Sequence, residues 1–166
     1  MKTTDILTLY DYSYWASTRI QRALLQVTRE QFSAANRSSH GSLRGTLVHA
    51  LFAQVIWRRR MMGEEMPSGL PKNDDYPTPQ TLADAFQAEE AQMRSYLASL
   101  NDDDLQAIVH YKTTKGVPQQ DARWHLLSHV LNHGTQHFAE AAAMLTDFGH
   151  SPGDVDMIIY FREKGL

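Results

Sequence analysis

The sequence predicts an all-α protein in which residues 1–166 form a single four-helix bundle. The prolines supply the first observation, because all six lie in three places, within 67–79, at Pro118 and at Pro152. Proline removes a backbone donor and clashes inside a helix, so helices are expected in the long stretches between these places. The second observation is that apolar residues recur there at helical spacing, as they do in helices that bury one face.

Three long helices are predicted in the first hundred residues. The first covers residues 3–26, and the second runs from about 42 to 62. The third spans about 80–100, where Thr78 offers an N-cap and Pro79 offers the proline that is common in a first helical turn. All three carry apolar residues at the spacing of a buried helix face, so each is expected to contribute one side to the core.

The fourth long helix is predicted over about 121–148, and Gly149 follows it as a typical helix-ending residue. A short terminal helix is expected within 152–162. The segment 63–79 is a long connection, which indicates one crossover in the bundle rather than a tight hairpin. The segment 108–117 contains β-branched and aromatic residues around a Lys-Gly pair, which is consistent with a short β-hairpin.

Composition excludes several classes of function. The chain has 16 basic and 19 acidic residues, so it lacks the positive field of a nucleic-acid-binding protein. Its mean hydropathy of −0.45 and the absence of an apolar run near 18 residues argue against a membrane span. There is no cysteine, which rules out disulfides, a thiolate nucleophile and cysteine ligands to a metal. The first residues show no signal segment, so a cytoplasmic location is expected.

Histidine is the unusual component, with eight residues, four of them in the fourth predicted helix. His125, His129, His133 and His137 follow one another at intervals of four, and each interval turns the side chain by roughly 40° about the helix axis. His133 and His137 lie beside the apolar stripe of this helix, whereas His125 lies nearly opposite it and is expected to be solvated. A pair at this spacing can place two imidazoles on one divalent ion, although such pairs also occur without a metal.

A third ligand has to come from another helix, and His49 is the candidate. The second predicted helix is apolar around most of its circumference, which indicates that it is largely buried. His49 shares a stripe with Gly45, Phe52 and Ile56, so its side chain is expected to point inward. Position alone leaves two interpretations open, a metal ligand and a core histidine satisfied by one hydrogen bond.

Three segments of the chain resemble the DinB family, which has YfiT-like relatives. The residues Tyr-Ser-Tyr-Trp-Ala at 12–16 are similar to the aromatic motif of the family's first helix. Residues 41–49 resemble the entry to its second helix, which ends in a metal-binding histidine. Residues 129–137 resemble its most specific motif, whose last two histidines bind metal. The resemblance covers nearly the whole chain and implies a four-helix bundle that holds one divalent metal ion.

The ligands that the resemblance implies are His49, His133 and His137. His129 also matches the family motif, but its position on the helix favours a supporting or core role. Zn or Ni is the expected ion, with Fe or another divalent metal as the alternative, because all-nitrogen ligation suits several of them. A divalent ion on three histidines keeps a coordination position open, which is the arrangement of catalytic sites.

The sequence departs from the family directly after the last motif histidine. Many members have Arg-Gly-Gln there, whereas this chain has Phe138, an alanine and Glu140, so the role of the arginine is not carried over. Glu140 is either a hydrogen-bond partner of a metal ligand or an exposed helical glutamate. The remaining histidines share a position in predicted loops or turns, where a surface side chain is expected: His40, His110 and His150.

Three consecutive arginines, Arg58–Arg60, lie in the last turns of the second predicted helix. We expect them to remain hydrated and to complement the helix dipole. The alternative is a patch that binds an anion or a nucleic acid.

The resemblance implies a function as well as a fold. Relatives of the family include bacterial thiol S-transferases, so a metal-dependent enzyme is expected, acting by thiol S-transfer or by metal-assisted hydrolysis. Its partner is then a small-molecule substrate, such as a low-molecular-weight thiol. The alternative is a non-catalytic protein that binds a metal or a small ligand in a stress response. The resemblance and the apolar second helix together predict a homodimer.

Overall fold

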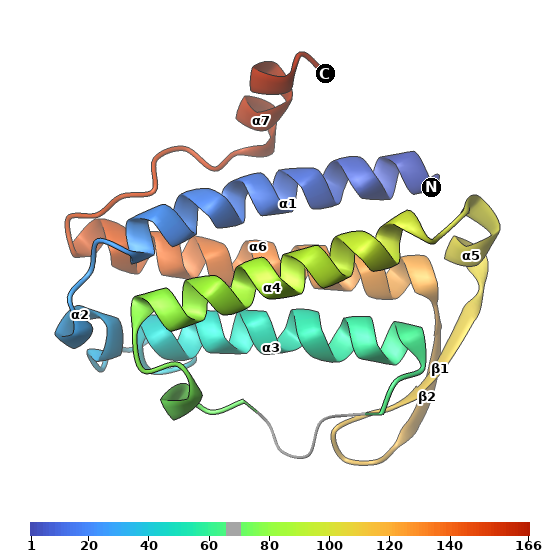
Figure 1. Ribbon diagram of the computed structural model, residues 1–166, viewed down its shortest axis with the longest axis horizontal. Coiled ribbons are helices and arrows are strands. Elements are labelled where there is room, and N and C mark those ends of the chain that lie inside the picture. The colour runs from blue at the N-terminus through green and yellow to red at the C-terminus, as the bar shows by residue number, and fades with distance from the viewer. Residues whose placement is uncertain (66–70) are drawn as a thin grey trace.

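The computed structural model describes residues 1–65 and 71–166, and its architecture is the expected helical bundle. Four long helices lie side by side (Figure 1): α1 (Thr3–Leu24), α3 (Leu43–Met62), α4 (Pro79–Ala98) and α6 (Arg123–Asp147). Both α3 and α1 pack against α6 and α4. The order around the bundle is therefore α1, α6, α3, α4, which leaves the α3–α6 groove opposite the α1–α4 groove.

The connection between α3 and α4 is the expected crossover. It carries the chain back along the bundle, so that α3 and α4 run in the same direction (Figure 1). Its second half contains a short 3-10 turn, Asn73–Asp75, and residues 66–70 of the predicted connection lie outside the described residues. The two ends of α3 show why the helix stops where it does. Ser42 caps the first turn by accepting a hydrogen bond from the Gly45 N–H, and Gly63 ends the helix with a φ of 70°.

The expected hairpin is present and is longer than predicted. Strand β1 (Ile108–Lys112) pairs antiparallel with β2 (Pro118–Ala122), and Ile108 lies opposite Ala122. Because Asp121 and Ala122 belong to the strand, α6 begins at Arg123 and not at residue 121. The Tyr111 hydroxyl donates a hydrogen bond of 2.8 Å to the Asp121 carboxylate, which holds this end of the hairpin together.

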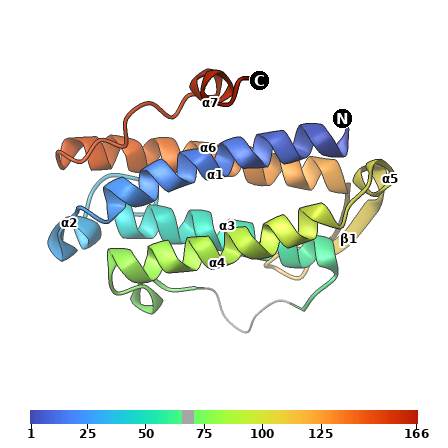
Figure 2. The same cartoon turned by 45° about the horizontal axis from the view of Figure 1, so that its top comes forward.

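Three short helices complete the fold: α2 (Arg29–Ser33), α5 (Asp102–Gln106) and α7 (Met157–Lys164). The predicted terminal helix within 152–162 begins later than expected, at Met157, after a segment without regular structure. In that segment the carbonyl of Val155 accepts a hydrogen bond of 2.9 Å from the Tyr12 hydroxyl, which holds the segment against α1. Helix α7 then lies outside the four long helices, against α1 (Figure 2).

The core consists of two apolar clusters. One surrounds α2 and includes Leu24, Phe32, Leu47, Phe86 and Phe138; the other lies toward the hairpin and includes Ile6, Tyr10, Met93, Leu105 and Leu127. No helix in the described part of the chain combines the length and apolar character needed to cross a membrane.

Two of the three arginines at the end of α3 are buried, so the prediction of a hydrated cluster was wrong. Arg58 is 4% exposed, and its guanidinium donates to both carboxylate oxygens of Glu89 at 2.7 and 2.9 Å. Arg60 is 9% exposed and lies over the Trp57 ring, 4.6 Å from its centroid. The cause is packing, because α4 and β1 both contact α3 and cover the face that carries these residues.

Candidate metal centre

Four histidines from three segments of the chain meet at the groove between α3 and α6. His49 comes from the second turn of α3, and His133 and His137 lie one turn apart on α6. His40 comes from the turn that precedes α3. All four are half-buried, so each ring is partly withdrawn from water while solvent still reaches the cluster.

The rings of the three predicted ligands are neighbours in the structure. The ring centroids of His49 and His133 are 4.9 Å apart, those of His49 and His137 are 4.8 Å apart, and those of His133 and His137 are 4.4 Å apart. The Nε2 atoms of His49 and His133 are separated by 3.0 Å. Two nitrogens on one tetrahedral zinc ion lie about 3.3 Å apart, given bonds of about 2.0–2.1 Å, so little movement is needed to place both on an ion.

His40 was expected to be a surface residue, and this expectation was wrong. Its ring stacks on that of His49, with centroids 3.9 Å apart and planes at 19°, and it meets the His137 ring edge-on at 5.1 Å. One possible ligand atom from each of His40, His49 and His137 lies within 4.8 Å of the others, so these three form a group able to hold a metal ion. Helical spacing gave no signal for His40, because its position depends on the path of a turn.

Local backbone contacts fix that turn. Gly41 has a φ of 74°, and its N–H donates to the Ser38 carbonyl at 3.1 Å. The carbonyl of Gly41 in turn accepts a hydrogen bond from the Asn36 N–H at 2.9 Å. Gly45 in the first turn of α3 is needed for close packing, because a Cβ there would overlap the carbonyl oxygen of His40. The turn therefore packs directly against the first turn of α3.

Glu140 contacts a histidine of the cluster and the turn that precedes α3, so it is not a free helical glutamate. Its Oε2 lies 3.3 Å from Nδ1 of His137, one helical turn earlier. Its Oε1 accepts a hydrogen bond from the Ser39 N–H at 3.1 Å. When Nδ1 of His137 donates to this carboxylate, the proton is held there and the Nε2 lone pair is left free for a metal.

The electrostatics of the cluster favour neutral imidazoles. Burial, reinforced by the neighbouring histidines, lowers the pKa of His49 to about 4 and that of His133 to about 4. Burial, reinforced by His137, also lowers the pKa of His40. Burial alone would raise the pKa of Glu140, but hydrogen bonds from Ser39 and His137 outweigh it and lower that pKa. Since only a neutral imidazole can ligate, these shifts favour the ligating form of His40, His49 and His133 at neutral pH.

A cavity of about 360 Å³ opens onto His40 and His49. Its other described lining residues include Phe52 and Pro71, together with Val48 and Gly45 of α3. The cavity is large enough to admit a small molecule to the histidines from outside the bundle.

The other histidines lie away from the centre. His129 is exposed, which rules out the core position; its ring lies 5.1 Å from that of Trp57 and 5.7 Å from that of His133. His125 is exposed, as predicted, and so is His110 on β1. His150 is half-buried just after α6.

Phe138, the residue that stands where many relatives have arginine, points away from the histidines. Its side chain is 4% exposed and belongs to the core cluster around α2, where its ring lies 6.0 Å from that of Phe86. The aromatic side chain at this position therefore fills the bundle interior.

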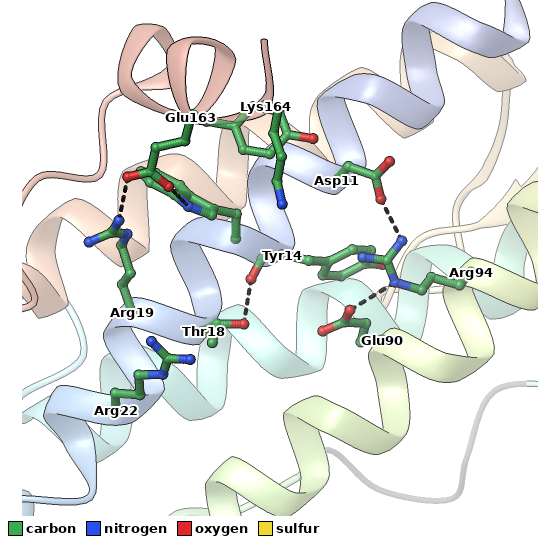
Figure 3. Close-up of a pocket in the computed structure, with 11 residues that line it drawn as sticks. Asp11, Tyr14, Thr18, Arg19, Arg22, Glu90, Arg94, Glu163 and Lys164 are labelled. Carbon is green, nitrogen blue, oxygen red and sulfur yellow. Dashed lines mark hydrogen bonds and ion pairs between the residues drawn. The ribbon is translucent and has the colours of Figure 1, made fainter. Parts of the chain in front are cut away.

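A second, larger cleft of about 640 Å³ lies between α1, α4 and α7 (Figure 3). Arg94 of α4 donates to Glu90 at 2.8 Å and also pairs with Asp11 of α1. Arg19 of α1 donates to Glu163 of α7 at 2.8 Å. Most of the charged side chains that line the cleft are therefore paired with an opposite charge. No histidine is among the described residues that line it.

Fold and site together define a class, a helical bundle with a histidine cluster able to hold a divalent metal between two of its long helices. The model of the DinB family matches residues 1–164, and the chain belongs to this family. It is 22% identical to Protein DinB of Bacillus subtilis over 156 residues, which cover 92% of this chain and 91% of that protein.

Two solved structures share the fold. A DinB-like protein from Bacillus cereus superposes with a TM-score of 0.68 at 18% identity, over 93% of this chain and 98% of that one. A conserved protein from Enterococcus faecalis superposes with a TM-score of 0.65 at 15% identity, over 87% of this chain and 96% of that one.

Proposed function

We propose that this protein is a metal-dependent enzyme in which His49, His133 and His137 bind one divalent ion. Zinc or nickel is the expected ion, and iron or another divalent metal is the alternative. The observation that carries the proposal is the 3.0 Å separation of the His49 and His133 Nε2 atoms. The donor set fits such an ion, because it consists of imidazole nitrogens, and a proton on Nδ1 of His137 that is donated to Glu140 would leave its Nε2 free to ligate.

The proposed reactions are thiol S-transfer and metal-assisted hydrolysis on a small-molecule substrate, such as a low-molecular-weight thiol. When bound, the ion supplies a Lewis acid that lowers the pKa of a water or thiol beside it. The chain itself contributes three imidazoles on packed helices, the Glu140 carboxylate beside Nδ1 of His137 and a cavity of about 360 Å³ for the substrate. With no cysteine in the sequence, the chain offers no thiolate nucleophile of its own.

Elemental analysis of protein purified without a histidine tag tests the metal, and turnover tests the reaction. We expect about one ion per chain in the natural protein and none in a His133→Ala variant. His125→Ala is the matched control, because His125 is an exposed histidine of the same helix. Turnover of a panel of thiols with electrophiles should require the ion. Turnover that survives complete metal removal would contradict the proposed mechanism.

The second candidate function is a non-catalytic protein that binds a metal or a small ligand in a stress response. The position of His40 favours it, since a fourth nitrogen beside the other histidines can fill the coordination position that catalysis needs. A metal-loaded protein without turnover on the thiol panel would support this candidate.

We also propose that the protein forms a homodimer, on the strength of its family resemblance. The apolar composition of α3 does not require a partner copy, because α4, α6 and β1 contact this helix within one chain. Exposed Met157 and Ile158 on α7 offer apolar surface for a partner. Light scattering at micromolar concentration tests the proposal, and a mass of 18.9 kDa would contradict it.

A further inference from the structure

We propose that His40 is a fourth ligand of the ion, so that the turn 36–41 closes the coordination sphere and a small molecule must displace His40 to reach the metal. This inference rests on the proposed metal site of His49, His133 and His137. It concerns a residue that lies outside all three segments resembling the family, in a turn and not on a helix.

The first support is the place of the His40 ring. It stacks on His49 at 3.9 Å between centroids and meets His137 edge-on at 5.1 Å, so it touches two of the three proposed ligands. A possible ligand atom of His40 lies within 4.8 Å of one on His49 and one on His137. Because the His40 ring stacks face to face on His49, a rotation of the His40 side chain is needed to turn one of its nitrogens toward the ion.

The second support is that the chain is built to hold His40 there. Glycine inside a helix costs about 1 kcal/mol relative to alanine. Gly45 nevertheless occupies the first turn of α3, and a Cβ at this position would overlap the His40 carbonyl. The neighbouring residue Ser39 donates its N–H to Glu140 at 3.1 Å, and its hydroxyl lies 3.2 Å from the same oxygen. Glu140 therefore ties the turn of His40 to the helix that carries His137.

The third support is the difference between a helix and a turn as a ligand carrier. His49, His133 and His137 lie within long helices that pack against each other, so their backbone positions are fixed by the core. His40 is attached through a turn, which is held by a few hydrogen bonds and by the contact at Gly45. Of the four ligands, His40 is the one that can leave without disturbing the bundle. Four nitrogens make a closed site and three leave an open one.

The experiment uses tag-free protein loaded with Co²⁺ at pH 7.5, whose visible spectrum reports the number and type of ligands. We expect a four-coordinate spectrum in the natural protein and a changed spectrum in His40→Ala. Free imidazole added to His40→Ala should restore the original spectrum, which a structural role of His40 would not predict. A chelator competition should show zinc affinity lower by roughly 10- to 100-fold in His40→Ala.

A second variant tests the role of His40 without replacing any of the proposed ligands. Gly45→Ala should displace the His40 backbone while leaving a good helix former in α3, so its Co²⁺ spectrum should shift toward that of His40→Ala. Azide or 2-mercaptoethanol should bind the Co²⁺ of His40→Ala at least about tenfold more tightly than that of the natural protein, because a position is open.

The outcomes separate this inference from the proposed function. If His40→Ala matches the natural protein in spectrum, chelator competition and azide binding, His40 is not a ligand, and the three-histidine site stands. If the natural protein takes up no Co²⁺ or Zn²⁺ at all, both the metal site and the role of His40 are wrong.

Discussion

The histidine centre and the cleft between α1, α4 and α7 are both clusters of ionisable side chains, but they are satisfied in opposite ways. In the cleft, opposite charges meet, and Arg19 and Arg94 each pair with a carboxylate at 2.8 Å. In the histidine centre, like groups meet, and the carboxylate that faces them is Glu140, 3.3 Å from His137. The cleft is also the larger space, at about 640 Å³ against about 360 Å³.

The difference teaches that the larger cavity of this protein is not the one that carries the candidate metal ligands. In the cleft, Arg94 is paired with Asp11 and Glu90, and the Arg19–Glu163 pair joins α1 to α7, which are structural roles. In the centre, the Nε2 atoms of His49 and His133 face each other at 3.0 Å, where an N–H of one ring donates to the lone pair of the other. Clustered imidazole nitrogens are a donor set that suits a divalent metal ion.

The largest expected effect comes from removing a proposed ligand. His133→Ala should lower the affinity for zinc by more than about 100-fold, because it removes one of the nitrogens that hold the ion. Chelator competition measures the change. Glu163→Gln, in the cleft, should leave zinc affinity unchanged, and equal losses in both variants would show that the two regions are not functionally distinct.

The next effect concerns the residue that links the centre to the turn of His40. Glu140→Gln should lower zinc affinity by roughly 10- to 100-fold, because a neutral amide no longer holds the proton on Nδ1 of His137 as strongly. The same Glu-to-Gln change at position 163 is the matched control. Equal zinc affinity in Glu140→Gln and the natural protein would restrict Glu140 to a structural role.

The histidine centre is also expected to make the stability of the protein depend on pH. The pKa of His49 and of His133 is about 4 in the folded, metal-free protein, against about 6.5 for a histidine in an unfolded chain. As the pH falls below about 6.5, these two histidines become protonated in the unfolded chain but stay neutral in the folded one, so the free energy of unfolding decreases until about pH 4. Above about pH 6.5, the free energy of unfolding does not depend on these two groups.

Thermal melts of metal-free protein between pH 7.5 and pH 4.5 measure this loss. In a His49→Gln, His133→Gln double variant the decrease should be smaller, since two of the responsible groups are gone. A natural protein whose melting temperature is the same at both ends of the range would show that the imidazoles are not held neutral by the fold.

The smallest effect is expected in the cleft itself. The side chains of Arg19 and Glu163 are 30% and 42% exposed, and such pairs contribute at most about 1 kcal/mol. Glu163→Gln should therefore lower the free energy of unfolding by less than that, and it should speed amide hydrogen exchange within α7. A large global loss of stability would mean that the cleft has a greater role in the fold than its exposure indicates.

The sequence was sufficient for the bundle and for part of the centre. Proline placement and apolar periodicity located the long helices within a few residues, since both depend on local backbone chemistry. Helical spacing indicated that His133 and His137 share one face of their helix, and the stripe on the second helix indicated that His49 points inward. Their assignment as ligands came from the resemblance to the DinB family. These residues lie on regular elements, where position along the chain determines the direction of the side chain.

Residues whose roles depend on distant partners were not predictable in this way. His40 reaches the cluster because its turn packs over Gly45 and because Ser39 bonds to Glu140, 101 residues further along the chain. Arg58 is buried because Glu89 of a different helix receives its guanidinium. Helical periodicity describes the faces of one element and contains no information about which other element covers them.

The most direct test of the central claim is a titration of tag-free, metal-stripped protein with Zn²⁺ and with Ni²⁺, followed by native mass spectrometry. We expect about one tightly held ion per chain in the natural protein and in Glu163→Gln, and none in His133→Ala or His49→Ala. A natural protein that holds no ion, or a His133→Ala variant that holds it equally well, would contradict the assignment of the histidine cluster as the metal centre.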